Sequence, residues 1–169
     1  MTPRLLCLLL ASGAAPASAD LVASTPAGFE VQHRVTVAAA PAAVWPVLTD
    51  PARWWSPAHT YSGDARNLSF DLRPGGCFCE RLPEGGVEHL RVVQVRMREQ
   101  LRLAGALGPL QGDGVAGALT LSLRPSGKGT EIVLRYIVGG WRPGGMESIG
   151  TAVDKVLGEQ LARLAATVR

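Results

Sequence analysis

The strongest constraint on the fold is a single amphipathic helix predicted at the end of the chain, from Met146 to Val168. Apolar side chains recur there at three- and four-residue spacing, with charged side chains opposite them. The apolar positions are Ile149, Val153, Val156, Leu157, Leu161, Leu164 and Val168, and the charged ones are Glu147, Asp154, Lys155, Glu159 and Arg163. Such a stripe has to be buried, so the helix needs a broad apolar partner surface.

A series of strand candidates separated by turn residues supplies that surface. Turns rich in proline and glycine, such as Arg73–Gly76 and Pro83–Gly86, separate them. The candidates cover residues 30–37, 66–72, 77–82, 87–96, 100–106, 115–124 and 130–139. Two short helices, one opening at Pro41 and one capped by Asp50, follow the first strand. The chain is therefore predicted to be an α+β protein with an antiparallel meander packed on the last helix.

The first 19 residues have the three-part pattern of a secretory signal peptide. Arg4 precedes an apolar stretch, residues 5–15, and Ala17-Ser18-Ala19 forms a small-residue cleavage site. The stretch is shorter than the roughly 20 apolar residues that span a bilayer, so cleavage after Ala19 and no stable membrane anchor are predicted. The expected product is periplasmic or secreted, and the alternative is an uncleaved tail on a cytosolic protein. A flexible lead-in, 20–28, and one domain, 29–169, are expected to follow.

The charge balance and the motifs exclude several classes of function. The chain has 17 basic and 14 acidic residues, a net charge of +3, and its arginines are scattered singly. Nucleic-acid binding therefore has no support. The sequence contains no G-x-S-x-G elbow, no H-E-x-x-H, no phosphate-binding loop and no dinucleotide fingerprint. Neither a cofactor nor a metal is predicted.

Three stretches carry a resemblance to a known superfamily: VTVAAAPAAVWPVLTDPARWW, PGGCFCERLPEGGVEHLRVV and VDKVLGEQLARLAATV. Together they resemble the SRPBCC, or START-like, superfamily, and within it the homologues of the activator of heat-shock ATPase, a branch grouped with polyketide cyclases. The resemblance implies the helix-grip fold, in which a curved antiparallel sheet of about seven strands wraps a long C-terminal helix. It also implies a cavity between sheet and helix.

The resemblance and the predicted export together favour a binding module for a small hydrophobic molecule. The expected cavity residues are Trp54, Trp55, His59, Tyr61, Phe70, Phe78, Glu80, His89, Arg91, Trp141, Val153 and Leu157. Aromatic rings near a cavity mouth can enclose an apolar ligand, although core or rim packing is the alternative for them.

Polar residues near the middle hairpin are predicted to share one face of the sheet. If Pro83–Gly86 form a four-residue loop, Glu80 lies opposite His89 and Phe78 opposite Arg91. That face is otherwise mostly apolar, so it is predicted to be the concave one. A hydrogen-bonded Glu80 and His89 there would orient the polar head of a ligand or act as an acid and a base. The alternative is an exposed ion pair near the hairpin tip.

Cys77 and Cys79 fall on the opposite face in this register, together with Leu90 and Val92. In a regular strand the two Cα atoms would be about 6.8 Å apart, near the upper limit for a disulfide. Two small buried residues are therefore favoured, with a disulfide or an intermolecular bridge as the alternative in an oxidising compartment. A bulge or a one-residue change in the loop would exchange the two faces.

Two further functions remain open at this point. A cavity enzyme of the cyclase, dehydratase or hydrolase type would use Glu80, His89 or His59 for proton transfer, with Asp64 or Tyr61 orienting His59. No residue is assigned a catalytic role, because no complete constellation is present. The segment 107–112 is predicted to be an exposed flap, and a co-chaperone-like interaction domain would dock an unknown protein partner through its residues Leu107 to Leu110 or through the sheet edge. His33 is predicted to be a surface or edge residue.

Overall fold

The structure, a computed structural model, describes residues 18–168. Residues 1–17 of the predicted signal peptide lie outside the described part of the chain. Among the described residues, no helix has both the length and the apolarity needed to cross a membrane.

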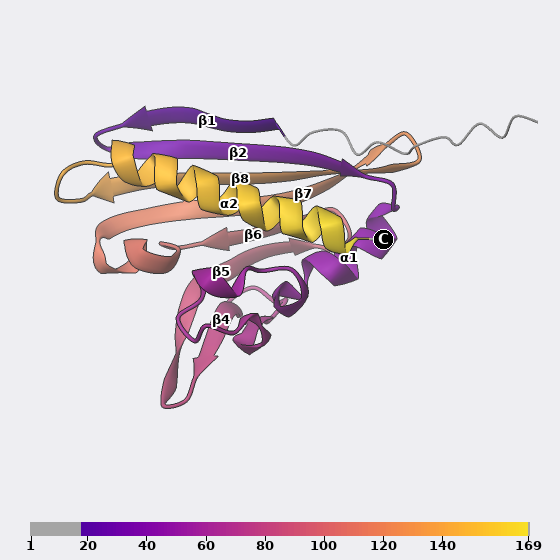
Figure 1. Cartoon of the computed structure of the whole chain (residues 1–169), viewed down its shortest axis with the longest axis horizontal. Coiled ribbons are helices and arrows are strands. Elements are labelled where there is room, and N and C mark those ends of the chain that lie inside the picture. The colour runs from indigo at the N-terminus through magenta and orange to yellow at the C-terminus, as the bar shows by residue number, and fades with distance from the viewer. Residues whose placement is uncertain (1–17, 169) are drawn as a thin grey trace, which may run out of the picture.

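A single eight-stranded sheet, with every neighbouring pair antiparallel, forms the body of the protein (Figure 1). Its spatial order is β1-β2-β8-β7-β6-β5-β4-β3. The strands are β1 (Ser18–Thr25), β2 (Gly28–Val37), β3 (Leu68–Phe70), β4 (Cys77–Leu82), β5 (Gly85–Arg96), β6 (Gln100–Ala104), β7 (Gly114–Ser126) and β8 (Gly129–Trp141). The predicted α+β helix-grip fold is therefore confirmed, with one strand more than expected.

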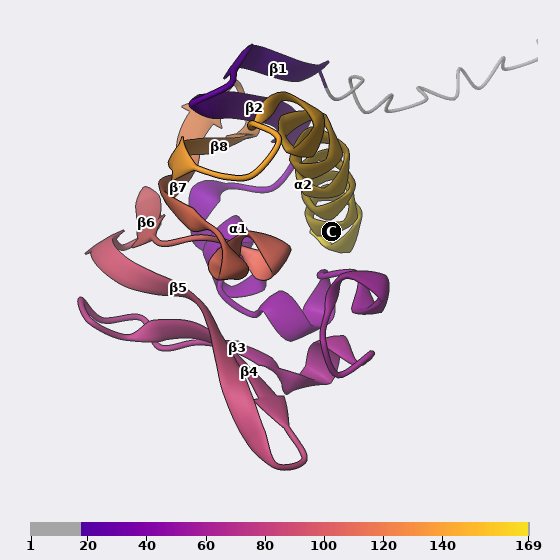
Figure 2. The same ribbon diagram turned by 90° about the vertical axis from the view of Figure 1, so that its left-hand side faces the viewer.

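Helices connect and cover this sheet. The predicted helix at the end of the chain is α2 (Glu147–Thr167), and Figure 2 shows it running along the concave side of the curved sheet. Helix α1 (Pro41–Leu48) follows β2 and accommodates Pro46 within its last turn. The second predicted short helix is a 3-10 turn, η1 (Pro51–Arg53). The other 3-10 turns are η2 (Pro57–His59), η3 (Ala65–Asn67) and η4 (Gly108–Gly112).

The core fills the space between the concave face and the helices. Alternate residues of β2, starting at Phe29 and ending at Val37, point inward, while their neighbours are more exposed. Helix α2 buries Leu157, Leu161 and Leu164 against this face. Full burial of each leucine contributes about 1.5–3 kcal/mol, so these contacts are a main reason why the helix stays on the sheet.

Residues 20–28, expected to be a flexible lead-in, instead form most of β1 and the turn that follows it. Thr25 pairs with Gly28, so Pro26 and Ala27 make a two-residue hairpin turn. The proline that suggested an irregular segment is therefore a turn residue, and the glycine is the first residue of β2. Strand β1 pairs with β2 from Ser18 onward, and cleavage after Ala19 would leave its pairing from Asp20 onward in place.

The prediction that His33 is a surface residue is wrong, because it lies on the inward-pointing side of β2 and is buried. Its Nε2 atom is 2.9 Å from Asp154 Oδ1 on α2. Gly158 makes this packing possible, since a Cβ atom there would lie 2.9 Å from Cε1 of the imidazole. Helix α2 therefore approaches β2 closely at a glycine.

Candidate ligand-binding cavity

A half-enclosed cavity of about 320 Å³ lies under the N-terminal half of α2. It is bounded by α2, by the segment from Trp55 to Tyr61, by residues 107–109 at the start of η4, and by His89 of β5. The lining residues are Trp55, Ala58, His59, Thr60, Tyr61, His89, Leu107, Gly108, Pro109, Ile149, Ala152, Val153, Val156 and Leu157. Most of this wall is apolar, as in cavities that bind small organic molecules.

The apolar side chains of α2 lie in two places, the core and the cavity wall. Leu161 and Leu164, in the C-terminal half, are packed in the core. Val153 and Val156 are only half-buried and form part of the cavity wall, and the buried Leu157 is also in this wall. The helix therefore both holds the fold together and roofs the cavity.

The β4–β5 hairpin brings the polar residues to this cavity in a register different from the predicted one. Leu82 pairs with Gly85, so the turn contains only Pro83 and Glu84, and Glu80 pairs with Val87. A bulge between Cys79↔Glu88 and Phe78↔Leu90 leaves His89 as the extra residue on β5. Because of this bulge, His89 and Leu90 are both buried on the inner face.

Glu80 is the acceptor for three donors behind the cavity wall at His89. It is buried and accepts hydrogen bonds from the backbone N–H groups of Tyr61 and Ser62. Its Oε2 atom is 3.0 Å from Nε2 of His89. Burial acts to raise the pKa of Glu80, but the hydrogen bonds from Ser62, Tyr61 and His89 outweigh it and hold that pKa below its ordinary value. The carboxyl group is therefore ionised at neutral pH.

His89 is neutral beside this carboxylate. Burial lowers the pKa of His89 below its ordinary value, and the opposing effect of Glu80 does not cancel the shift. Since the Glu80 carboxylate can only accept, Nε2 carries the proton and Nδ1 keeps a lone pair. The ring stacks on Tyr61, with centroids 5.9 Å apart, and contacts Phe78 at 5.0 Å. Within residues 18–168, Nδ1 has no hydrogen-bond partner.

A second histidine–carboxylate pair lies at the exposed side of the cavity. His59 Nε2 is 3.2 Å from Glu159 Oε2 on α2, and both side chains are partly exposed. Hydrogen bonds from Ser56 and His59 lower the pKa of Glu159. Neither Asp64 nor Tyr61 is the partner of His59, as the enzyme hypothesis expected. Asp64 instead caps η3 and pairs with Arg66.

The segment 105–113, which we call the flap, closes one side of the cavity. Tyr136 on β8 holds it, since its hydroxyl donates to Gly105 O and accepts from Leu107 N. Burial raises the pKa of Tyr136 to about 12, which keeps the hydroxyl protonated. Gln111 Nε2 donates to Glu88 O, so the flap is also tied to the bulge of β5.

The flap differs from the exposed docking segment that its sequence suggested. Leu110 is buried, and Leu107 packs against the core and lines the cavity. Of these three apolar residues of the flap, Pro109 is the exposed one. The apolar side chains of the flap therefore point mostly inward.

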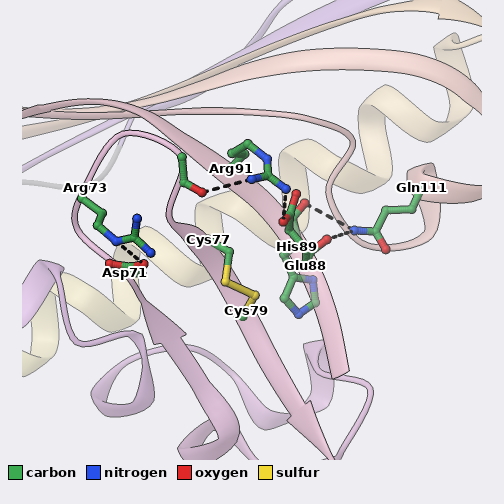
Figure 3. The surroundings of a disulfide bond; sticks show 9 residues. Asp71, Arg73, Cys77, Cys79, Glu88, His89, Arg91 and Gln111 are labelled. Carbon is green, nitrogen blue, oxygen red and sulfur yellow. Dashed lines mark hydrogen bonds and ion pairs between the residues drawn. A yellow bond between two sulfur atoms is a disulfide. The ribbon is translucent and has the colours of Figure 1, made fainter. Parts of the chain in front are cut away.

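Cys77 and Cys79 form a disulfide on the outer face of β4, with Cα atoms 5.3 Å apart (Figure 3). This is the alternative to the favoured prediction, and the shorter Cα separation than in a regular strand coincides with the bulge in the pairing with β5. The prediction that Arg91 lies on the concave face is wrong, because the bulge turns it outward. Arg91 pairs with Cys77, is exposed, and donates to Glu88 Oε2.

Half of the residues predicted for the cavity lie in its wall: Trp55, His59, Tyr61, His89, Val153 and Leu157. Four others pack behind it, namely Trp54, Phe70, Phe78 and Glu80. Trp54, for example, donates its indole N–H to Leu48 O and is a core residue. Trp141 is 72% exposed at the end of β8 and, like Arg91, lies outside the wall.

The sequence predicted a flap but did not place it at the cavity, and it gave no indication of several small residues in the wall. Ala58, Thr60 and Ala152 carried no chemical signal, and Ile149 and Val156 were assigned to the helix stripe without being placed at the cavity. Their spacing of three and four residues from Val153 was the signal that would have found them. Among residues 18–168, no cluster of side chains suited to hold a metal ion occurs.

Comparison with known proteins gives a family and a fold. The sequence profile of a family described as polyketide cyclase / dehydrase and lipid transport matches residues 28–169. No curated protein matches the sequence. Among solved structures, the Mll3558 protein from Rhizobium loti is 20% identical with a TM-score of 0.62, over 83% of this chain and 96% of that one. An uncharacterised protein from Rhizobium leguminosarum is 18% identical with a TM-score of 0.60, over 91% and 98%. The Aha1 dimer from Colwellia psychrerythraea is 16% identical with a TM-score of 0.57, over 82% and 95%.

Proposed function

The chain belongs to the polyketide cyclase, dehydrase and lipid-transport family, and on this premise we propose that it is a binding module for a small, largely apolar molecule. The observation that carries the proposal is the half-enclosed apolar cavity with the buried His89 in its wall. Its volume of about 320 Å³ lies at the lower end of the range found for small-molecule sites. A ligand with one or two rings fits that size.

The proposed location is outside the cytoplasm, and the support for it is the signal-peptide pattern of the first 19 residues. N-terminal sequencing of the protein recovered from the periplasm or the medium is expected to start at Asp20. An intact Met1 in the cytosolic fraction would contradict the proposed export and leave the binding proposal untouched.

Binding itself is tested by filling the cavity. Native mass spectrometry of protein purified gently from its own host is expected to show a bound small molecule, and apolar ring compounds are expected to raise the melting temperature. Ala152→Trp places an indole in the cavity and should abolish both effects. Thr151→Trp, on the exposed side of the same helix turn, is the matched control. Protein that is always empty and unshifted by every compound would refute the proposal.

A cavity enzyme of the cyclase, dehydratase or hydrolase type is the second candidate, and the Glu80–His89 pair favours it. A neutral histidine oriented by an ionised carboxylate is suited to act as a general base. The two candidates differ in what happens to a bound compound. Recovery of the compound with unchanged mass supports binding alone, whereas conversion that is lost in His89→Phe supports the enzyme.

A further inference from the structure

Cys77 and Cys79 flank a residue that supports the cavity wall from behind. Side chains alternate along β4, so the disulfide lies on the outer face (Figure 3), while Phe78 between the cysteines points inward and is buried. Its ring centroid lies 5.3 Å from that of Trp55 and 5.0 Å from that of His89. Both of these residues line the cavity. One side chain therefore connects the disulfide-bonded segment to the cavity wall.

The disulfide holds β4 shorter than a regular strand at this point. The Cα atoms of the two cysteines are 5.3 Å apart, whereas two residues of a regular antiparallel strand span about 6.8 Å. Without the S–S bond the segment is free to lengthen by about 1.5 Å. Its start is held in place, because Cys77 O accepts a hydrogen bond of 2.9 Å from Asp71 N. The lengthening therefore displaces Phe78 and the residues that follow it.

A displacement of this size is large enough to change the wall at His89. The imidazole has two supports on β4, the ring of Phe78 and the carboxylate of Glu80. The Glu80 Oε2 atom is 3.0 Å from Nε2 of His89, and such a hydrogen bond is lost beyond about 3.5 Å. A gap of about 0.5–1 Å between packed rings already forfeits a quarter to a half of their attraction. Both supports of His89 thus depend on the length of β4 between the cysteines.

We propose that the disulfide between Cys77 and Cys79 controls the shape of the cavity, and that the oxidised form holds the wall in its ligand-binding arrangement. The two cysteines are each partly exposed on the outer face. Reduction takes two electrons and two protons from a dithiol: the S–S bond breaks, each Sγ becomes a thiol, and the dithiol is oxidised to a disulfide. Strand β4 then lengthens, and Phe78 no longer supports Trp55 and His89. The inference rests on the proposed binding function for its consequence, but its first test needs no ligand.

The indole N–H signals of the four tryptophans, in a ¹H–¹⁵N correlation spectrum, report on this coupling. Trp55 packs on Phe78 and donates its indole N–H to His59 O. Its signal should therefore move by more than its line width when the protein is reduced with dithiothreitol. Trp141 is exposed on β8, separated from β4 by three strands, and its signal should stay in place. Trp55→Phe assigns the signal by removing it.

Two variants assign the movement to the disulfide and to Phe78. Cys77→Ser/Cys79→Ser should place the Trp55 signal where the reduced wild type has it and should not respond to dithiothreitol. Since this double variant keeps Cys7, the third cysteine of the chain, it also controls for that thiol. Phe78→Leu keeps the disulfide and removes the ring, so the Trp55 signal should respond much less to reduction. If Phe78→Leu does not fold, the cysteine double variant decides.

Binding is measured separately, by isothermal titration calorimetry with 2-naphthol at pH 7.5. The reduced protein and the cysteine double variant should bind this probe about fourfold or more weakly than the oxidised protein, as expected for the loss of contact equivalent to one buried methylene group. Failure of 2-naphthol to bind either form would count against the proposed binding function, and the indole signals would then decide the redox coupling alone.

The outcomes separate the two proposals. An unmoved Trp55 signal on reduction, a cysteine double variant with this signal at its oxidised position, or equal affinity of both forms for 2-naphthol would each overturn the inference and leave a binding cavity. Loss of dispersion in the signals of all four tryptophans would show that the disulfide supports the whole fold, which would overturn the local coupling as well. A Trp55 signal that moves while Trp141 stays, together with weaker binding by the reduced form, supports the inference.

Discussion

Replacing Glu80 by alanine is expected to cost about 3–5 kcal/mol of unfolding free energy, because three donors lose one acceptor. The N–H of His89 is buried and meets no other acceptor in the described chain, so it bears the full penalty of about 1–3 kcal/mol. The backbone N–H groups of Tyr61 and Ser62 are part-buried and can donate to water instead, which limits the loss of unfolding free energy from each to about 1 kcal/mol. Removing one partner of a buried pair costs a similar amount in other proteins.

Urea unfolding at pH 7.5, followed by tryptophan fluorescence, measures this loss, and circular dichroism should show a melting temperature about 10 °C lower. Glu80→Gln keeps one acceptor oxygen and should lose about half as much. Glu88→Ala is the matched control, since it removes the same charge from an exposed ion pair and should cost under about 1 kcal/mol. The reasoning is refuted if Glu80→Ala is no more destabilising than Glu88→Ala.

Three further outcomes are expected. The pKa values of Glu80 and His89 are both lower in the folded protein than in the unfolded chain, so the unfolded chain binds more protons in acid. The free energy of unfolding, measured in urea at a series of pH values, should therefore decline as the pH falls below about 6.5. In His89→Phe the part of this decline nearest pH 6.5, which comes from the histidine, should disappear. The double variant Cys77→Ser/Cys79→Ser should fold and lose under about 2 kcal/mol in urea, because the closed loop is so short. Gly158→Ala should lose about 1 kcal/mol in thermal unfolding, since its methyl group would crowd a buried imidazole by more than the helix gains; a more stable variant would contradict the close approach.

The fold could be predicted from the sequence because apolar residues recur in its strands and in its last helix at the spacing typical of each. The helix predicted over residues 146–168 is observed over 147–167, and all seven strand candidates match within two residues at each end. Strand β1 was missed because Pro26 and Gly28 suggested an irregular segment, whereas they belong to a tight hairpin that only pairing with β2 reveals.

The site was predicted less well, because it depends on a single extra residue. The inner-face positions of Glu80 and His89 agree with the prediction, although the predicted pairing between them was wrong. The two-residue turn shifts the pairing by two residues, which leaves the same residues on each face, and the bulge at His89 then exchanges the two faces beyond it. Arg91, beyond the bulge, therefore points outward. Sequence periodicity assumes regular strands and carries no information on where a bulge lies.

The attachments of the flap have a consequence for how a ligand comes and goes. Tyr136 and Gln111 each hold the flap by hydrogen bonds, and those of Gln111 go to the backbone of the β5 bulge that contains His89. Movement of the flap away from the cavity breaks the hydrogen bonds of Gln111 to the carbonyl groups of Glu88 and His89. Opening of the flap is therefore coupled to the conformation of the bulge that contains His89. The shape of the cavity wall at His89 therefore depends on whether the flap is attached.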